Sequence, residues 1–207
     1  MKKLLSRDEL ARELFEKGCI AFGEFTLSAG GKSPYYIDLR KIPSYPDLYD
    51  KVTDLYVDVL CKLQFDKVIG IATAGIPIAA LTAYKLNKPF LYVRKEAKDY
   101  GLQKQIEGVL EKGDRVVIVD DVITTGSNII RAVDAIRSAE AIVDKAIVLV
   151  DREQGGFEVL KKLNVELLSI VKASQLVESL HGLKLISDEI YYRVMAYIRE
   201  SVKSAIG

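Results

Sequence analysis

Five short, nearly continuous apolar runs alternate with helix-like segments through the middle of this 207-residue chain. The runs are rich in β-branched residues, and the segments between them carry apolar residues at helical spacing. Strands that are apolar on both faces and separated by helices are typical of a parallel sheet covered on both sides. The sequence therefore predicts an α/β fold with a five-stranded doubly wound parallel sheet flanked by helices. The predicted strands are KVIGIA (67–72), PFLYVR (89–94), RVVIVD (115–120), KAIVLVD (145–151) and VELLSIV (165–171).

Helices are predicted between these strands and at both ends of the chain. Ser6 and Glu9 have the spacing of a capping box, which predicts a helix over residues 7–17. Pro46 suits the first turn of a second helix that runs to about Leu63. Apolar spacing and flanking residues predict further helices at about 75–86, 127–138, 155–163 and 188–204.

The two ends of the chain are expected to form a small cap beside the sheet. Residues 20–27 and 35–39 have the pattern of short strands outside the main sheet. We therefore expect a single domain over residues 1–207. Residues up to about 45 and the C-terminal helix would form the cap, or hood, and the core sheet would occupy residues 65–171, approximately.

Composition and charge exclude several classes of protein. The chain is 49% hydrophobic and 29% charged, as in ordinary globular proteins, and its 30 basic and 29 acidic residues leave a net charge of +1. This balance gives no general attraction to nucleic acid or membrane. There is no apolar run of transmembrane length, and the first ten residues lack the apolar run of a signal peptide. With only two cysteines, Cys19 and Cys61, we expect reduced, buried thiols in a cytoplasmic protein without nucleic-acid or membrane partners.

The segment VVIVDDVITTGSN (116–128) carries the most specific chemical pattern. An apolar strand runs into two carboxylates, Asp120 and Asp121, then into a hydroxyl-rich turn with Gly126, then into a helix. The N–H groups of such a turn and the dipole of the following helix can bind phosphate, while paired carboxylates can accept hydrogen bonds from ribose hydroxyls. An ordinary strand-to-helix turn would explain any one of these parts. The full ordered string instead predicts a site for a phosphorylated ribose.

This string resembles the phosphoribosyl diphosphate (PRPP) binding motif of the type I phosphoribosyltransferases. Three further segments resemble the orotate phosphoribosyltransferase branch of that family: FTLSAGGKSPYYIDLRK (25–41), RKEAKDYG (94–101) and DREQGG (151–156). The resemblance covers most of the chain. It implies transfer of the 5-phosphoribosyl group from PRPP to orotate, giving orotidine 5′-monophosphate and pyrophosphate in pyrimidine (UMP) biosynthesis. It also implies Mg²⁺ as cofactor, bound mainly through PRPP and water and not at a protein metal site.

The resemblance assigns roles to particular residues. The matched catalytic positions are Lys98, Asp120 and Asp121. The matched PRPP-binding positions are Arg94, Lys95, Lys98, Tyr100, Asp120, Asp121, Val122, Ile123, Thr124, Thr125, Gly126, Ser127 and Asn128. The matched orotate-binding positions are Lys32, Tyr36, Thr124 and Arg152, with Arg152 opposite the orotate carboxylate. Because the 94–108 loop acts in the neighbouring subunit's site in that family, a homodimer is implied.

Two further segments are expected to belong to the site. Residues 95–110 are polar although they lie between two core strands. A solvated surface excursion would explain them, but a start at a strand's C-terminal end favours a functional loop. The turn ATAGIP (72–77) is expected to face pyrophosphate.

Three positions depart from the family pattern: Ser28, Ala74 and Tyr100 stand where some family members have lysine, lysine and histidine, respectively. The sole histidine, His181, is expected to be structural or on the surface.

Two alternatives remain open from the sequence. A phosphoribosyltransferase for another base, such as a purine or uracil, would retain residues 116–128 but has no need for the segments at 25–41 and 151–156. A PRPP-sensing regulator that binds RNA or DNA would show a concentrated basic face and a decayed loop. The near-neutral charge and the cationic residues at 94–98 argue against the regulator.

Overall fold

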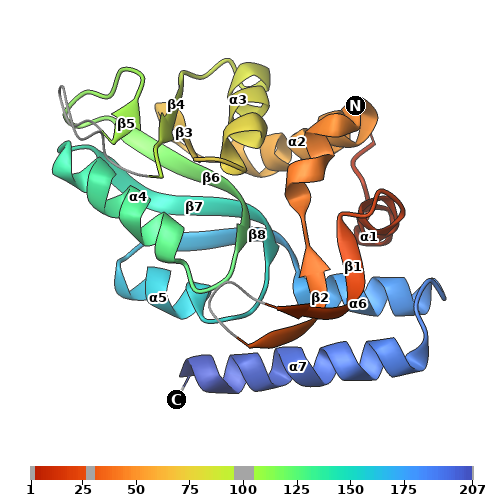
Figure 1. The fold of residues 1–207 in the computed structure, drawn as a ribbon. Helices are drawn as coiled ribbons and strands as arrows, with labels where there is room; N and C mark the ends of the chain where they lie inside the picture. The colour runs from red at the N-terminus through yellow and green to blue at the C-terminus, as the bar shows by residue number, and fades with distance from the viewer. Residues whose placement is uncertain (1–2, 27–30, 96–104, 207) are drawn as a thin grey trace.

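The computed structural model describes residues 3–26, 31–95 and 105–206, the last four of these by backbone alone. Its centre is a sheet of strand order β5-β4-β3-β6-β7-β8 (Figure 1). Five of these strands are mutually parallel: β3 (Lys67–Ile71), β4 (Phe90–Val93), β6 (Arg115–Ile123), β7 (Ile142–Asp151) and β8 (Glu166–Lys172). The predicted α/β class and all five predicted strands are confirmed.

The sheet has a sixth strand that the sequence analysis did not predict. This strand, β5 (Ile106–Glu107), pairs antiparallel with β4 at the edge of the sheet. It lies inside the polar 95–110 segment, which was expected to be a functional loop throughout, so part of that segment is a strand. Two residues are too few to give a period-two pattern, and edge pairing with β4 supplies what local propensity does not.

The strand order reverses direction at β3. Among the parallel strands, β3 lies between β4 and β6, so the chain moves outward from β3 in both directions. In open α/β sheets, ligands bind outside the carboxyl ends of the strands where the order reverses in this way. The residues that follow β3 and β6 therefore stand at the expected ligand site.

Helices cover both faces of the sheet (Figure 1). On one face lie α2 (Pro46–Leu60) and α3 (Gly75–Lys85), and on the other lie α4 (Ser127–Ser138) and α5 (Gly156–Lys162). The strand residues divide between the two faces with a period of two: Val117 and Val119 pack with α2 and α3, whereas Val116 and Ile118 pack with α4. Near-continuous apolar strands are explained by this double burial.

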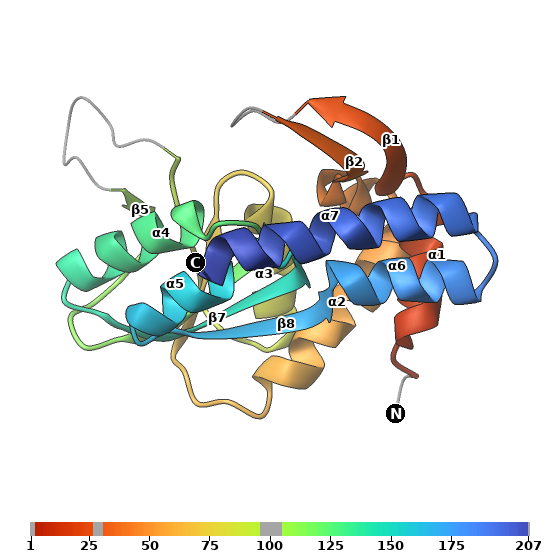
Figure 2. The same cartoon turned by 90° about the horizontal axis from the view of Figure 1, so that it is seen from below.

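A group of elements from both ends of the chain packs beside the α2 and α3 face. It consists of α1 (Arg7–Glu16), the antiparallel pair β1 (Ile20–Thr26) and β2 (Lys32–Ile37), the 3₁₀ helix η1 (Leu39–Ser44), α6 (Ala173–Gly182) and α7 (Asp188–Ile206). Helices α6 and α7 run side by side (Figure 2). The capping box of Ser6 and Glu9 is present at α1. The six predicted helices are confirmed to within three residues at each end, whereas η1 and α6 were not predicted.

The cysteines and helices bear on two further expectations. Cys19 is buried, and burial raises the pKa of its thiol to about 11, but Cys61 is exposed at the end of α2, so its predicted burial was wrong. Both thiols are free. Within the described ranges, no helix is long and apolar enough to span a bilayer.

Candidate active site

Two buried carboxylates stand near the carboxyl end of β6. Asp120 and Asp121 are only 5% and 6% exposed. Their positions are fixed by backbone donors: Asp121 N–H donates to Asp120 Oδ1 at 3.0 Å, and Val122 N–H donates to Asp121 Oδ1 at 2.9 Å. Burial away from water raises the pKa of both carboxyls, and the charge of Asp121 raises that of Asp120 further. Such a pair is prepared to accept hydrogen bonds from hydroxyl donors.

A small pocket of about 100 Å³ lies next to the carboxylates. It is lined by Asp120, Val122, Ile123, Thr124, Thr125, Gly126, Ser127, Asn128 and Ile129. Gly126 adopts a positive φ of 84° as the residue before α4, which turns the chain sharply into the helix. The hydroxyls of Thr125 and Ser127 lie 2.9 Å apart. Backbone N–H groups at a helix start together with hydroxyl groups are the donors that bind a phosphate.

The turn after β3 approaches the carboxylates closely. Gly75 begins α3, and a Cβ at this position would lie 2.6 Å from Asp120 Oδ1 and 3.0 Å from the carbonyl oxygen of Val119. Real Cβ atoms do not come so close, so the contact requires glycine. Helix α2 holds the same region from behind, since the Tyr56 hydroxyl donates to the Asp120 carbonyl oxygen at 2.8 Å. The predicted turn at 72–77 therefore lies beside the carboxylate pair.

A buried arginine follows β7, next in the fold to a residue that lines the pocket. Arg152 directly follows β7 and is 7% exposed, and its backbone N–H donates to the Ile123 carbonyl oxygen at 2.9 Å. Its guanidinium lies over the ring of Tyr35 from β2, with Cζ 4.7 Å from the ring centroid. Nε donates to the Tyr35 hydroxyl at 3.3 Å, but the buried Nη2 has no hydrogen-bond partner among the described residues. A buried donor without a partner is costly, so a ligand acceptor at Nη2 would remove that cost.

Comparisons with known proteins show the family of this chain. Residues 41–179 match the phosphoribosyl transferase domain family. The orotate phosphoribosyltransferase of Staphylothermus marinus is 43% identical over 95% of this chain and 97% of its own length. The crystal structure of orotate phosphoribosyltransferase from Aeropyrum pernix superposes with a TM-score of 0.77 at 39% identity, covering 86% of this chain and 99% of that one. This chain belongs to the orotate phosphoribosyltransferase family.

A longer solved protein contains a similar unit. The structure of Leishmania donovani UMP synthase superposes with a TM-score of 0.87 at 36% identity over 95% of this chain. The match spans 43% of that protein, so this chain corresponds to less than half of it. The resemblance to the orotate phosphoribosyltransferase family found in the sequence is thereby confirmed over most of the chain.

Tyr36 lies in a cluster that the sequence analysis did not foresee. Its ring is 37% exposed and lies 5.5 Å from the ring of Phe25. Its hydroxyl accepts a hydrogen bond of 3.1 Å from Nη2 of Arg40, whose Nε donates to Asp38 at 2.6 Å. Arg40 was quoted within the orotate-branch segment, but no role was given to it. The signal that could have found it is its four-residue distance from Tyr36 across a strand end.

The other sequence-predicted cations are distributed differently. Lys32 pairs with Glu24 across the β1–β2 hairpin at 2.7 Å and lines an open groove against α7, not the pocket at residues 120–129. Arg94 follows β4 and pairs with Glu107 of β5 at 2.6 Å, while Lys95 is exposed. Lys98, Tyr100 and Ser28 lie outside the described residues. Arg94 and Gln105 lie close together, because the backbone N–H of Arg94 donates to the Gln105 carbonyl oxygen at 2.8 Å.

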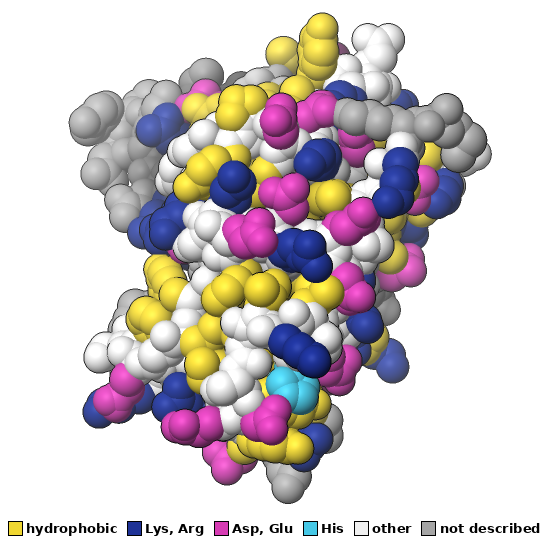
Figure 3. Space-filling model, turned by 90° about the vertical axis from the view of Figure 1, so that its right-hand side faces the viewer, with side chains coloured by type: hydrophobic (Ala, Val, Ile, Leu, Met, Phe, Trp, Pro, Cys, Tyr) yellow, Lys and Arg dark blue, Asp and Glu magenta, His cyan; other side chains and the backbone are white. Residues whose placement is uncertain are grey.

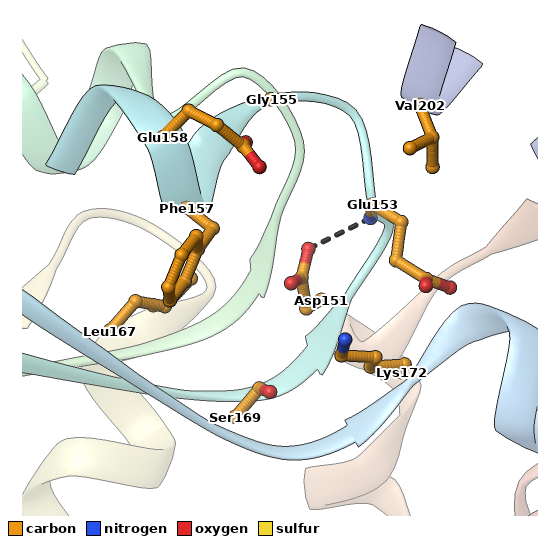
Figure 4. Close-up of a pocket in the computed structure, with 9 residues that line it drawn as sticks. All are labelled: Asp151, Glu153, Gly155, Phe157, Glu158, Leu167, Ser169, Lys172 and Val202. Atoms are coloured by element: carbon orange, nitrogen blue, oxygen red, sulfur yellow. Dashed lines mark hydrogen bonds between the residues drawn. The ribbon is translucent and has the colours of Figure 1, made fainter. Parts of the chain in front are cut away.

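A second pocket of about 220 Å³ lies where β7 leads into α5 (Figure 4). Asp151, Glu153 and Glu158 contribute carboxylates to it, and Phe157 and Leu167 form an apolar wall. Asp151 accepts a hydrogen bond from Glu153 N–H at 2.8 Å, and burial raises its pKa. Lys172 also lines the pocket, but the three carboxylates make it less suited to phosphate than the pocket at residues 120–129.

The surface shows no gathering of one charge on the face drawn in Figure 3. Among the described side chains there, basic and acidic groups are interspersed. His181 is held in the cap: Nε2 lies 2.7 Å from Asp188 Oδ1, and its ring stacks on Tyr191 at 4.2 Å. It joins α6 to α7, and it is not among the residues that line the pocket at residues 120–129. The expectation of a structural or surface histidine is confirmed.

Proposed function

We propose that this chain transfers the 5-phosphoribosyl group of PRPP to N1 of orotate, forming orotidine 5′-monophosphate and releasing pyrophosphate in pyrimidine biosynthesis. The C1′–O bond to the diphosphate breaks and the N1–C1′ bond forms. Orotate supplies the electron pair as an anion, and the diphosphate departs with the electrons of the broken bond. The enzyme's task is therefore to position the two substrates and to stabilise charge.

One observation carries this proposal. The pocket at residues 120–129, called here the phosphate pocket, is joined to Arg152 by a backbone hydrogen bond: Arg152 N–H donates to the Ile123 carbonyl oxygen at 2.9 Å. The residue that carries the unpartnered guanidinium donor is thus joined through its backbone to the pocket proposed for a phosphorylated sugar. Orotate differs from uracil by a carboxylate, and a guanidinium is the side chain best suited to bind a carboxylate through two parallel hydrogen bonds.

Each part of the pocket receives one part of PRPP in this proposal. Residues Thr124 to Asn128 enclose the 5′-phosphate, with Val122 and Ile123 forming the strand end behind it. Asp120 and Asp121 accept hydrogen bonds from the 2′- and 3′-hydroxyls. Ionised carboxylates close to C1′ also favour the positive charge that develops on the ribose as the bond to the diphosphate weakens. Thr124 borders the orotate side as well.

The base and the leaving group are bound by the remaining predicted residues. Arg152 pairs with the orotate carboxylate, Tyr36 lies against the base, and Lys32 serves the same side of the site. Arg94, Lys95, Lys98 and Tyr100 bind the departing diphosphate, with Lys98 the main catalytic cation. Positive charge delivered there neutralises the leaving group as it forms.

Mg²⁺ enters the reaction with PRPP in this account. Among the described residues, no group of three or more His, Cys, Asp or Glu side chains converges on one point. Diphosphate, ribose and water oxygens are hard ligands of the kind that Mg²⁺ prefers, so in this proposal the ion is bound mainly through PRPP and water. Magnesium neutralises diphosphate charge when it is bound.

A homodimer in the cytoplasm completes the proposal, with the 94–108 loop of each subunit acting in the other's site. Exposed apolar side chains support an interface on this side of the sheet: Val109, two residues after β5, is 72% exposed, and Tyr84 of α3, a helix that contacts β4, is 82% exposed. The rings of Phe90 and Tyr92 stack on β4 at the same edge. Sedimentation of the purified protein at micromolar concentration is expected to give twice the mass of the chain.

The reaction itself is tested by following both products. With PRPP and magnesium, the absorbance loss of orotate and the release of pyrophosphate are expected at a one-to-one ratio, and chelation of magnesium is expected to stop both. Pyrophosphate release without orotate consumption would mean hydrolysis of PRPP and would contradict the transfer reaction.

A further inference from the structure

Arg40 interacts with two residues of the proposed site: it hydrogen-bonds Tyr36 on the base side and acts electrostatically on Asp121 on the ribose side. It lies on η1, where the buried side chains of Leu39 and Ile42 anchor the helix in the core. Its own side chain is 61% exposed and so is not held by packing. Its position is set by two hydrogen bonds, both to residues of the segment that precedes it.

The two hydrogen bonds use one edge of the guanidinium. Nε donates to Asp38 Oδ1 at 2.6 Å, and Nη2 donates to the Tyr36 hydroxyl at 3.1 Å. A guanidinium presents these donors in a rigid plane, which the single ammonium of lysine cannot reproduce. The hydroxyl of Tyr36 is therefore tied to Asp38 through Arg40, although the ring itself is 37% exposed.

The charge of Arg40 also has a small effect on Asp121, one of the two carboxylates proposed to bind the ribose. Helix η1 contacts β6. The guanidinium of Arg40 lowers the pKa of Asp121, against the larger opposite effect of burial. A single side chain thus touches the residue expected to lie against the base and acts on a residue expected to bind the ribose.

We propose that Arg40 is a positioning residue for orotate: it holds the Tyr36 ring in the orientation that the base requires, acting through the Tyr36 hydroxyl and braced by Asp38. This inference rests on the proposed orotate transfer. Pre-orienting a half-exposed ring lowers the entropy lost when the base binds. The effect belongs to orotate affinity, since neither hydrogen bond of Arg40 reaches the phosphate pocket.

A double-mutant cycle tests this inference, with Arg40→Ala, Tyr36→Phe and the double variant compared with the unchanged protein. We expect each single change to raise the orotate KM about five-fold, the order of one lost hydrogen bond to a partly exposed charged group. The KM for PRPP and kcat are expected to stay within about two-fold. Because both changes remove the same hydrogen bond, the double variant is expected to be no worse than either single one.

Arg40→Lys separates positioning from charge. Lysine keeps the charge but not the planar pair of donors, so this variant is expected to behave like Arg40→Ala. Arg12→Ala, an exposed arginine of α1, is the control for loss of a surface charge. The inference would be overturned by an unchanged orotate KM in Arg40→Ala or by an orotate KM in Arg40→Lys equal to that of the unchanged protein. It would also be overturned if the increases in orotate KM of the two single variants multiplied in the double variant. Absence of orotate turnover in the unchanged protein would instead overturn the proposed function.

Discussion

The guanidinium of Arg152 lies over the ring of Tyr35, with Cζ 4.7 Å from the ring centroid and Nε donating to the tyrosine hydroxyl at 3.3 Å. Tyr35 packs edge-on against Tyr197 of α7, with ring centroids 6.0 Å apart. The C-terminal helix therefore supports the residue that orients the proposed carboxylate-binding arginine. This support explains how segments from both ends of the chain contribute to a site at the carboxyl ends of the strands.

Tyr35→Phe tests this support. The substitution keeps the ring under Arg152 but removes the hydroxyl that accepts from Nε, so the guanidinium loses its in-plane anchor. We expect the orotate KM to rise several-fold and the free energy of unfolding to fall by about 1 kcal/mol. Steady-state kinetics and thermal denaturation measure the two effects. Tyr192→Phe, which alters a 67% exposed ring on α7, is the matched control and is expected to change neither. An unaltered orotate KM in Tyr35→Phe would show that the hydroxyl does not orient Arg152.

Gly75→Ala tests the close contact between the β3 turn and Asp120. The new Cβ would lie 2.6 Å from Asp120 Oδ1, so either the turn or the carboxylate must move. We expect kcat/KM for PRPP to fall by about a hundred-fold or more, because catalytic groups tolerate little displacement. Gly182→Ala is the control, since a Cβ there meets nothing within 4 Å. Equal activity of the two alanine variants would contradict the assignment of Asp120 to the site.

Asp120→Asn separates stability from function. Burial raises the pKa of Asp120 above its unfolded value, so folding favours the protonated form. The free-energy cost of burying ionised Asp120 is absent below about pH 4. It grows as the pH rises through the pKa of the folded protein. The asparagine variant is therefore expected to be more stable than the unchanged protein by about 1 kcal/mol or more at neutral pH, while losing most activity.

Thermal denaturation of both proteins at about pH 5 and about pH 8 measures this difference. The advantage of Asp120→Asn is expected to be larger at the higher pH, where the unchanged protein must bury a charge. A variant that is less stable than the unchanged protein at pH 8 would mean that ionised Asp120 stabilises the fold, contrary to this account.

Lys98→Ala tests the catalytic assignment that rests on resemblance alone, because Lys98 lies outside the described residues. We expect kcat to fall by about a hundred-fold or more with an unchanged melting temperature, since the lysine's role is to neutralise the leaving diphosphate. Lys112→Ala, which removes an exposed lysine paired with Glu140, is the control. Full turnover by a folded Lys98→Ala protein would remove Lys98 from the mechanism.

The sequence predicted the sheet and its helices well because their signals are local. The α4 prediction of 127–138 agrees with the observed Ser127–Ser138, since a glycine turn precedes it and apolar residues recur at helical spacing. Helix α6 was missed although Leu176 and Leu180 are fully buried. It follows β8 without a clear break in the sequence, so its start was hidden by the apolar strand.

The site was predictable where one contiguous segment builds it, and not where distant segments meet. The phosphate pocket comes almost entirely from residues 120–129. The stacking of Arg152 on Tyr35 joins residues 117 positions apart, and no local pattern signals it. The hydrogen bond from Arg40 to Tyr36 depends on the path of the chain from β2 into η1, which the letters IDLR do not define.

The most direct test of the central claim compares orotate with uracil, hypoxanthine and adenine as acceptors, for the unchanged protein and for Arg152→Ala. Orotate and uracil differ only in the carboxylate assigned to Arg152. We predict PRPP-dependent turnover of orotate alone by the unchanged protein, and a large rise in the orotate KM in Arg152→Ala with the PRPP KM nearly constant. Turnover of another base in place of orotate, or an unchanged orotate KM in the variant, would contradict the account.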